Sequence, residues 1–223
     1  MNTIISILMI ATGVSNMTSG DKTGVWLEEF AVPYVKFKKE GFEVTVATIN
    51  GGETPIDPSS LEGVKPEWKD AMDSLKNAKK LDAIDSQKYI AVYVPGGHGA
   101  MFDLAEDKVV KEILAEFADA GKVVSAVCHG PAALVGVKLK NGKYLVDGKK
   151  LTSFTNSEED EVKKSDKMPF MLESKLVEQG GIFQAKGNWA DNVVTDGNLI
   201  TGQNQSASNS IADAIIKNLK LKK

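Results

Sequence analysis

Short apolar runs alternate with longer segments of helical periodicity along most of the chain. Short runs rich in β-branched residues are typical of buried strands, and apolar residues three and four positions apart are typical of helices. Strands are therefore expected at residues 4–10, 43–48, 89–94, 123–127, 151–154 and 199–201, and helices at 27–40, 66–77, 108–120, 131–137, 169–179 and 206–219. This alternation predicts an α/β fold, a doubly wound and mainly parallel sheet with helices on both faces.

Two segments depart from the alternation. Residues 140–143 and 146–149 have the composition of hairpin turns around a short apolar piece, which predicts a small antiparallel excursion. Residues 51–85 are polar and hold three of the seven prolines, so we interpret them as an inserted loop and helix beside the site. Since no linker composition divides the chain, residues 1–223 are expected to form one domain.

The apolar residues 4–11 resemble the core of a secretory signal, but no Lys or Arg precedes them and the first cation is Lys22. The run is also too short to span a membrane. A first buried strand therefore explains it better, and we expect no membrane association.

Composition narrows the function. The chain has 223 residues, 42% of them hydrophobic, and a net charge of −3, which argues against nucleic-acid binding. Its single cysteine, Cys128, excludes an intramolecular disulfide and a cysteine-rich zinc site, and it is consistent with a reducing, cytoplasmic location. The sequence shows no phosphate-binding loop, and we expect neither a metal nor a nucleotide cofactor.

Cys128 lies where a predicted strand turns into a predicted helix. Residues 126–130, Ala-Val-Cys-His-Gly, resemble a nucleophile elbow with sulfur in place of oxygen. Such a turn strains its central residue and exposes the side chain above the sheet. The helix N-terminus that follows, together with His129, predicts a depressed pKa for the Cys128 thiol.

A glycine-rich loop follows the strand expected at residues 89–94. Parallel strands place ligands at their carboxyl ends, so this loop and the cysteine turn are expected at one edge of the sheet. Backbone N–H groups of Gly96, Gly97 and His98, together with His129 or Gly130, would stabilise an oxyanion there.

Candidate acids and bases are few. Glu28 and Glu29 open the first long helix, and only one of them can face Cys128 as a general acid or base. The chain has two histidines, neither of them downstream of His129, so a cysteine–histidine dyad must use His129 or His98. An orienting acid would come from the acidic run 158–161.

Three motifs together resemble the ThiJ/PfpI superfamily, which includes the parkinsonism-associated DJ protein and is related in fold to class I glutamine amidotransferases. They are residues 126–131 (Ala-Val-Cys-His-Gly-Pro), 95–99 (Pro-Gly-Gly-His-Gly) and 23–29 (Thr-Gly-Val-Trp-Leu-Glu-Glu). Phe-Thr-Asn at 154–156 and Leu-Ile-Thr-Gly-Gln-Asn at 199–204 agree as well, so the resemblance spans the chain. The heat-shock-protein-31-like branch is the most similar.

The resemblance implies a flavodoxin-like fold, a homodimer and a glutathione-independent glyoxalase, of glyoxalase III type, acting on small reactive dicarbonyls in a stress-protective role. Carried over by position, it makes Cys128 the nucleophile, His129 its partner and Glu29 the inward acid. The third triad acid falls at Glu158 or Glu159. The chain departs from many relatives at residues 32–33 (Val-Pro for His-Pro) and from some at residue 205 (Gln for Pro), both near the expected substrate pocket.

The same residues permit other functions. A cysteine amidase, peptidase or protein deglycase would use the same nucleophile. A holdase chaperone or redox sensor would need no turnover, and oxidation of Cys128 would then be the relevant event. For the glyoxalase function, either Glu29 or His129 serves as the base.

Overall fold

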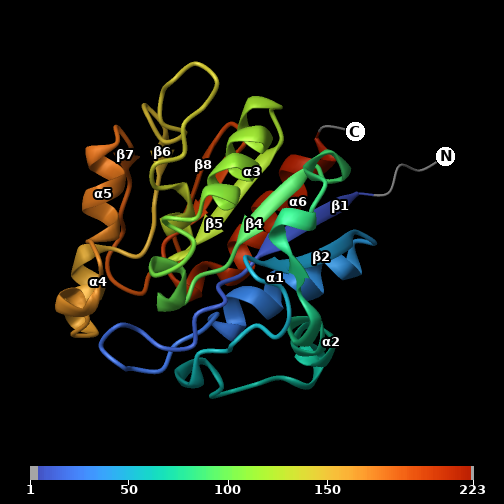
Figure 1. The fold of residues 1–223 in the computed structure, drawn as a ribbon, viewed down its shortest axis with the longest axis horizontal. Coiled ribbons are helices and arrows are strands. Elements are labelled where there is room, and N and C mark those ends of the chain that lie inside the picture. The colour runs from blue at the N-terminus through green and yellow to red at the C-terminus, as the bar shows by residue number, and fades with distance from the viewer. Residues whose placement is uncertain (1–4, 222–223) are drawn as a thin grey trace.

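The computed structural model describes residues 5–221, which form a seven-stranded sheet in the order β3-β2-β1-β4-β5-β9-β8 (Figure 1). The bounds are Ser6–Ile10 for β1, Glu43–Thr48 for β2, Lys79–Lys80 for β3, Ala91–Val94 for β4, Val123–Val127 for β5, Val193–Asp196 for β8 and Leu199–Gly202 for β9. Neighbouring strands are parallel except for β8 and β9. The predicted α/β fold with a mainly parallel sheet is therefore confirmed.

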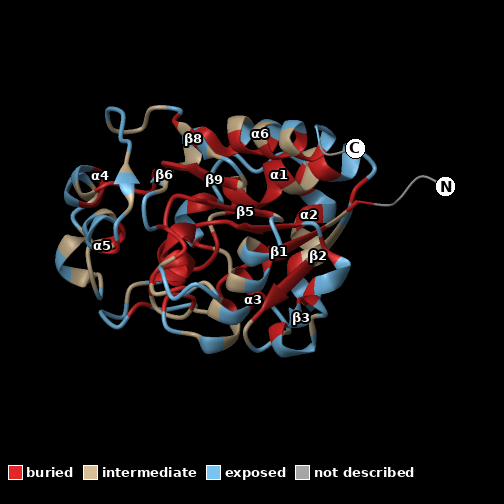
Figure 2. Ribbon diagram, turned by 90° about the horizontal axis from the view of Figure 1, so that it is seen from above, coloured by how far each residue is buried: buried red, intermediate tan, exposed pale blue. Residues whose placement is uncertain are grey.

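Helices cover both faces of the sheet (Figure 2). The helices α1 (Leu27–Lys39), α2 (Lys69–Ser74) and α6 (Ser208–Lys220) pack on one face, and α3 (Lys108–Asp119) packs on the other. Strand β1 shows why both faces need cover, because its side chains enter the two cores alternately. The apolar N-terminal run is thus an internal strand of the sheet; Ile4 lies outside the described residues.

The sequence of α3 accounts for the packing of this helix and for the residue at which it begins. In α3, Val110, Ile113, Leu114 and Phe117 form the buried stripe, with the spacing of an amphipathic helix. Asp107 caps this helix by accepting a hydrogen bond from the N–H of Val110 at 2.9 Å. The sheet and α3 together bury the second hydrophobic core.

The segment 51–85, interpreted as an insertion, lies between β2 and β4 and carries α2 and β3. The helix predicted at 66–77 is broken into a 3-10 turn (Pro66–Trp68), α2 and a second 3-10 turn (Leu75–Asn77). Strand β3 was not anticipated, because its two exposed lysines, Lys79 and Lys80, give no apolar signal.

Other predictions need correction around Cys128. The helix predicted at 131–137 is only a 3-10 turn, Gly130–Leu134. The strand predicted at 151–154 is reduced to β6 (Lys150–Leu151), which pairs with β7 (Ile182–Phe183) in a separate two-stranded sheet. The next residues turn into a helix that the sequence did not indicate, α4 (Asn156–Glu161), and the helix predicted at 169–179 is α5 (Leu172–Glu178).

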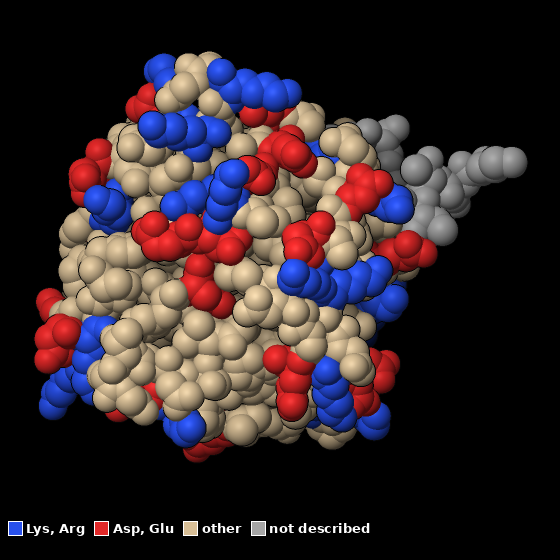
Figure 3. All heavy atoms as spheres, viewed as in Figure 1, with Lys and Arg blue, Asp and Glu red and all other residues tan. Residues whose placement is uncertain are grey.

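The antiparallel excursion is present as a bridge between Lys138 and Tyr144 around the turn at residues 140–143. The surface seen in Figure 3 intersperses acidic and basic side chains, without a basic patch of the size expected for nucleic-acid binding. Over residues 5–221, none of the helices combines the length and apolar character needed to cross a membrane.

Candidate active site

Cys128 directly follows β5 and has a left-handed backbone conformation, with a φ of 59°. Its N–H donates to the carbonyl oxygen of Gly202 at 3.0 Å, and its own carbonyl oxygen accepts from the N–H of Phe154 at 2.8 Å. Such a conformation costs a non-glycine residue about 1–3 kcal/mol, and the surrounding structure must enforce it. The strained turn that the elbow pattern predicts is therefore present at the carboxyl edge of the sheet.

The loop after β4 packs directly against this turn. A Cβ atom on Gly96 would lie 2.8 Å from Cβ of Cys128, and one on Gly130 would lie 2.2 Å from the carbonyl oxygen of Val94. Both positions therefore need glycine for close approach. The N–H of Gly96 donates a hydrogen bond to Glu29 at 2.9 Å and so is not free to stabilise an oxyanion, the role expected of it from the sequence. The N–H groups of Gly97 and His129 interact with the Cys128 thiol instead.

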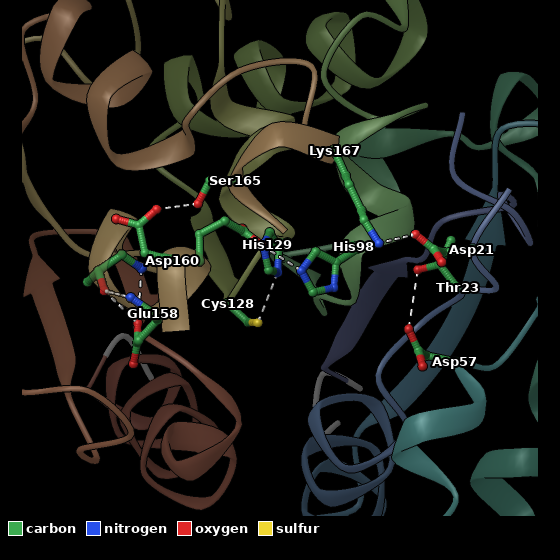
Figure 4. Close-up of polar contacts among 12 residues, drawn as sticks. Asp21, Thr23, Asp57, His98, Cys128, His129, Glu158, Asp160, Ser165 and Lys167 are labelled. Carbon is green, nitrogen blue, oxygen red and sulfur yellow. Dashed lines mark hydrogen bonds and ion pairs between the residues drawn. The ribbon is translucent and has the colours of Figure 1, made fainter. Parts of the chain in front are cut away.

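His129 connects the thiol to a buried carboxylate (Figure 4). Its Nδ1 lies 3.3 Å from Sγ of Cys128, and its Nε2 lies 2.7 Å from Oε2 of Glu159. Burial opposes ionisation of Glu159, but hydrogen bonds from His129 and His98 outweigh it and lower the pKa of Glu159. An ionised carboxylate can only accept hydrogen bonds, so Nε2 of His129 carries a proton and donates to Glu159. When the imidazole is neutral, Nδ1 has no proton and can accept the proton of the thiol.

His98 occupies the other oxygen of the same carboxylate. Its Nε2 lies 2.9 Å from Oε1 of Glu159, and its ring centroid is 4.0 Å from that of His129. Burial, and then the proximity of His129, lower the pKa of His98 to about 3. His98 is therefore neutral at pH 7 and donates a hydrogen bond to Glu159. The sequence places His98 in the oxyanion group or, as an alternative to His129, in a dyad with Cys128; the structure instead shows His129 beside the sulfur and His98 on the shared carboxylate of Glu159.

Glu158, the alternative triad acid, points away from His129. Its Oε2 accepts from the N–H of Thr155 at 2.9 Å in a capping box at the start of α4. Its Oε1 accepts from the N–H of Trp189 at 2.9 Å and from the amide of Asn204 at 2.7 Å. The structure therefore distinguishes the two candidate acids of the run 158–161: Glu159 contacts the histidines, and Glu158 organises the surrounding loops.

Glu29 is fully buried on α1, whereas Glu28 is half-buried. Oε2 of Glu29 accepts from Gly96, Oε1 is buried without a nitrogen or oxygen partner among the described residues, and the carboxyl group interacts with the Cys128 thiol. Burial raises the pKa of Glu29 to about 8, although the hydrogen bonds with Cys128 and Gly96 oppose the rise. The carboxyl group is therefore mostly protonated at neutral pH, beside the sulfur.

The expected depression of the Cys128 pKa is wrong. Burial raises the pKa of this thiol well above its ordinary range, and the Glu29 carboxyl raises it further, while the N–H groups of Gly97 and His129 only partly compensate. The expectation depended on a helix dipole, but the 3-10 turn after Cys128 is too short to supply one. In the free protein, the thiol therefore keeps its proton at neutral pH, beside the protonated carboxyl group of Glu29.

A cavity of about 230 Å³ opens onto the thiol. Trp26, Phe154 and Trp189 provide aromatic walls, and Cys128, His129, His98 and Gly97 form the reactive side. Ser59, Val162, Lys164 and Gln205 complete the lining. A larger groove of about 570 Å³, lined by residues 53–76, does not include the thiol, so we place the site at the smaller cavity.

Three non-glycine residues of the described chain have a positive φ: Cys128, Lys163 at 58° and Trp189 at 63°. Cys128 and Trp189 line the cavity, and Lys163 separates Val162 from Lys164, which also line it. Backbone strain is thus concentrated at this site, as is common where function fixes the geometry. Sequence patterns did not indicate Trp189 or Lys164, because neither belongs to a reactive motif.

His98, His129 and Glu159 also form a cluster of metal-ligand type, with their ligand atoms all within 4.8 Å. Both carboxyl oxygens already accept hydrogen bonds from the imidazoles at 2.7 and 2.9 Å. A metal ion would have to displace these bonds, so the arrangement fits proton relay better than coordination.

Comparisons with known proteins find relatives that align over most of the chain. The model of the DJ-1/PfpI family matches residues 22–218. Glyoxalase 3 of Candida albicans is 33% identical, and the alignment covers 89% of this chain and 91% of that protein. The glutathione-independent glyoxalase HSP31 of Saccharomyces cerevisiae is 32% identical, and the alignment covers 91% of this chain and 92% of that protein. The crystal structure of glyoxalase III from Candida albicans superposes with a TM-score of 0.87 at 30% identity, covering 96% of this chain and 97% of that one.

Proposed function

Because the chain belongs to the DJ-1/PfpI family, we propose that it is a glutathione-independent glyoxalase that converts small 2-oxo aldehydes such as methylglyoxal into 2-hydroxy acids. The observation that carries the proposal is the hydrogen-bonded series Cys128–His129–Glu159, with the protonated carboxyl of Glu29 on the other side of the sulfur. The names of the two yeast relatives support the same reaction class.

The cavity favours a small substrate. Its volume of about 230 Å³ lies below the roughly 300–1,000 Å³ of most small-molecule pockets. The thiol is 5% exposed, so a folded protein chain cannot reach it without rearrangement. A peptide substrate would need a more open cleft than this one.

The first chemical step is addition of the thiol to the aldehyde. His129 Nδ1 takes the thiol proton, Sγ bonds to the aldehyde carbon, and Glu29 gives its proton to the aldehyde oxygen. The product is a hemithioacetal, with Glu29 now ionised and His129 protonated. Glu159 stabilises the protonated imidazole that this step forms, because its carboxylate accepts from Nε2.

The second step moves a proton and two electrons between adjacent carbons. The Glu29 carboxylate removes the hydrogen from C1 while protonated His129 gives its proton to the oxygen on C2, which leaves an enediol, a protonated Glu29 and a neutral His129. Glu29 then returns its proton to C2, and Nδ1 of His129 takes the proton of the C1 hydroxyl. C1 is thereby oxidised to a thioester and C2 is reduced to an alcohol. Water attacks the thioester: its hydroxyl completes the new carboxyl group, its other proton goes to Sγ of Cys128 as the C–S bond breaks, and transfer of a proton from His129 to Glu29 restores the starting protonation of the site. The net reaction consumes one water and no external oxidant.

A substrate panel tests the reaction class. The purified protein should consume methylglyoxal without added thiol, and Cys128→Ala should not. Peptide and amide substrates, tested in parallel at the same enzyme concentration, should give no comparable turnover. Hydrolysis of an amide by Cys128, with methylglyoxal untouched, would replace the proposal with an amidase.

A further inference from the structure

One cation lines the catalytic cavity. Lys164 is half-buried and borders the same cavity as Cys128 and His129, while most of the remaining wall is aromatic or aliphatic. The proposed proton-transfer steps do not require it. Its placement therefore needs a separate explanation.

The backbone holds Lys164 in place at some cost. Lys163 takes the left-handed conformation at the end of α4, and the N–H of Lys164 then donates to the carbonyl oxygen of Glu159 at 3.1 Å. A lysine in this conformation is strained, because glycine or asparagine normally ends a helix in this way. The helix that supplies Glu159 thus also turns Lys164 toward the cavity, and the exposed Lys163 absorbs the strain.

The ammonium group of Lys164 makes no hydrogen bond or ion pair with residues 5–221 of the structure. The nearby acid Asp21 is paired with Lys167 at 2.8 Å. Hydrogen bonds from Lys167 and Ser19 lower the pKa of Asp21, and the charge of Lys164 contributes to the lowering without direct contact. Burial and His129 account for most of the lowering of the His98 pKa, and the charge of Lys164 contributes to it, so this charge acts on the site. A cation without a direct partner among the described residues, in a partly apolar cavity, favours an anionic ligand there.

A second cavity, of about 350 Å³, adjoins the first and shares Trp26, Ser59 and Gln205 with it. Glu28 and Glu62 line this second cavity, and Lys65 is its one cation. A negative group on a substrate is therefore better accommodated beside Lys164 than in the neighbouring cavity.

We infer that Lys164 forms an anion subsite, which makes 2-oxo aldehydes with a carboxylate at the far end of the carbon chain better substrates than their neutral counterparts. This inference rests on the proposed glyoxalase function. The reaction at the two carbonyl carbons is unchanged: 4,5-dioxopentanoate plus water would give 2-hydroxyglutarate, with C5 oxidised, C4 reduced and the distant carboxylate untouched.

The test compares kcat/KM for 4,5-dioxopentanoate with that for its methyl ester, which has the same reacting carbons and no charge. Hydrogen bonds to charged groups contribute about 1.5–3 kcal/mol, which corresponds to roughly 10–100-fold. We expect the ratio of acid to ester to fall by that factor in Lys164→Met and to be largely restored in Lys164→Arg. Lys65→Met removes the cation of the second cavity and should keep the wild-type ratio.

An unchanged ratio in Lys164→Met, or an equal fall in Lys65→Met, would refute the subsite. Binding of 2-hydroxyglutarate, followed by the fluorescence of Trp26 and Trp189 in the cavity wall, gives a readout without turnover. If the wild type turns over neither substrate, the proposed function fails, and the binding titration decides on the subsite alone. Weaker binding by roughly 10–100-fold in Lys164→Met supports it, and equal binding overturns it.

Discussion

The imidazole Nε2 of His129 lies 2.7 Å from Oε2 of Glu159, and this contact fixes which nitrogen of His129 can reach the sulfur. Since Glu159 holds the proton on Nε2, Nδ1 is left as an acceptor 3.3 Å from Sγ of Cys128. The histidine next to the nucleophile in sequence can therefore act as its base.

The adjacent glutamates Glu158 and Glu159 should separate activity from stability. Glu159→Gln removes the charge that stabilises protonated His129, and it should lower kcat by about 10²–10⁴-fold, the usual contribution of acid–base catalysis. Glu158→Gln should retain kcat but place an amide NH2 where acceptors are needed, and it should lower the free energy of unfolding by about 1–3 kcal/mol. Methylglyoxal turnover and urea unfolding of both variants check this prediction. Loss of turnover in Glu158→Gln, with turnover retained in Glu159→Gln, would make Glu158 the triad acid.

Glu29 and Glu28 form a second matched pair. Glu29→Gln should keep the fold and lose turnover by about 10²–10⁴-fold, because it removes the group that carries the proton between carbons. Glu28→Gln should cost little, since it removes only a first-turn charge worth about 0.3–1 kcal/mol to the helix. Steady-state kinetics with methylglyoxal distinguishes the two. If both variants remain active, Glu29 is structural and His129 must serve as the base.

The pH dependence of stability should report the buried Glu29. Its pKa is raised from 4.5 to about 8 in the folded protein, so only the unfolded chain ionises between these values. Folding stability should therefore fall as pH rises from about 4.5 to 8, by on the order of 4 kcal/mol in total, since each tenfold change in proton affinity corresponds to about 1.4 kcal/mol. The Glu29→Gln variant has no carboxyl group to ionise and does not lose stability in this way. The free energy of unfolding of the variant minus that of the wild type should therefore be larger at pH 8 than at pH 4. Denaturant unfolding at the two pH values measures the difference, and a difference independent of pH would contradict the raised pKa.

Alkylation of the single thiol should show that Cys128 is protonated in the free protein. Iodoacetamide should react slowly at pH 7, with a rate that keeps rising beyond pH 9, because burial and Glu29 disfavour the thiolate. Glu29→Gln should speed the reaction at neutral pH by removing one of these causes. Mass spectrometry of the modified protein follows the rate. A plateau at or below pH 8 in the wild type would restore the low pKa that the sequence suggested.

Periodicity was enough to predict most of the sheet, because buried parallel strands such as β1 and β5 are short, continuous apolar runs. Periodicity failed for α4, because its six residues are all polar and the helix is stabilised by the Thr155–Glu158 capping box rather than by an apolar stripe. That miss left the choice between Glu158 and Glu159 open.

Local motifs indicated Cys128, His129 and Glu29, since each lies in a distinctive turn or helix start. They could not reveal the burial that raises the Cys128 pKa, or the turn at Lys163 that places Lys164 in the cavity. The burial depends on contacts between segments that are distant in sequence, and the turn at Lys163 is formed by a lysine where glycine or asparagine would normally mark the end of a helix.

The most direct test of the central claim is the appearance of lactate from methylglyoxal in thiol-free buffer, followed by proton NMR for wild type and Cys128→Ser at equal concentration. The proposed mechanism predicts lactate in proportion to methylglyoxal consumed by the wild type and none above the uncatalysed rate with Cys128→Ser. Unchanged methylglyoxal with the wild type, or equal lactate formation by both proteins, would contradict it.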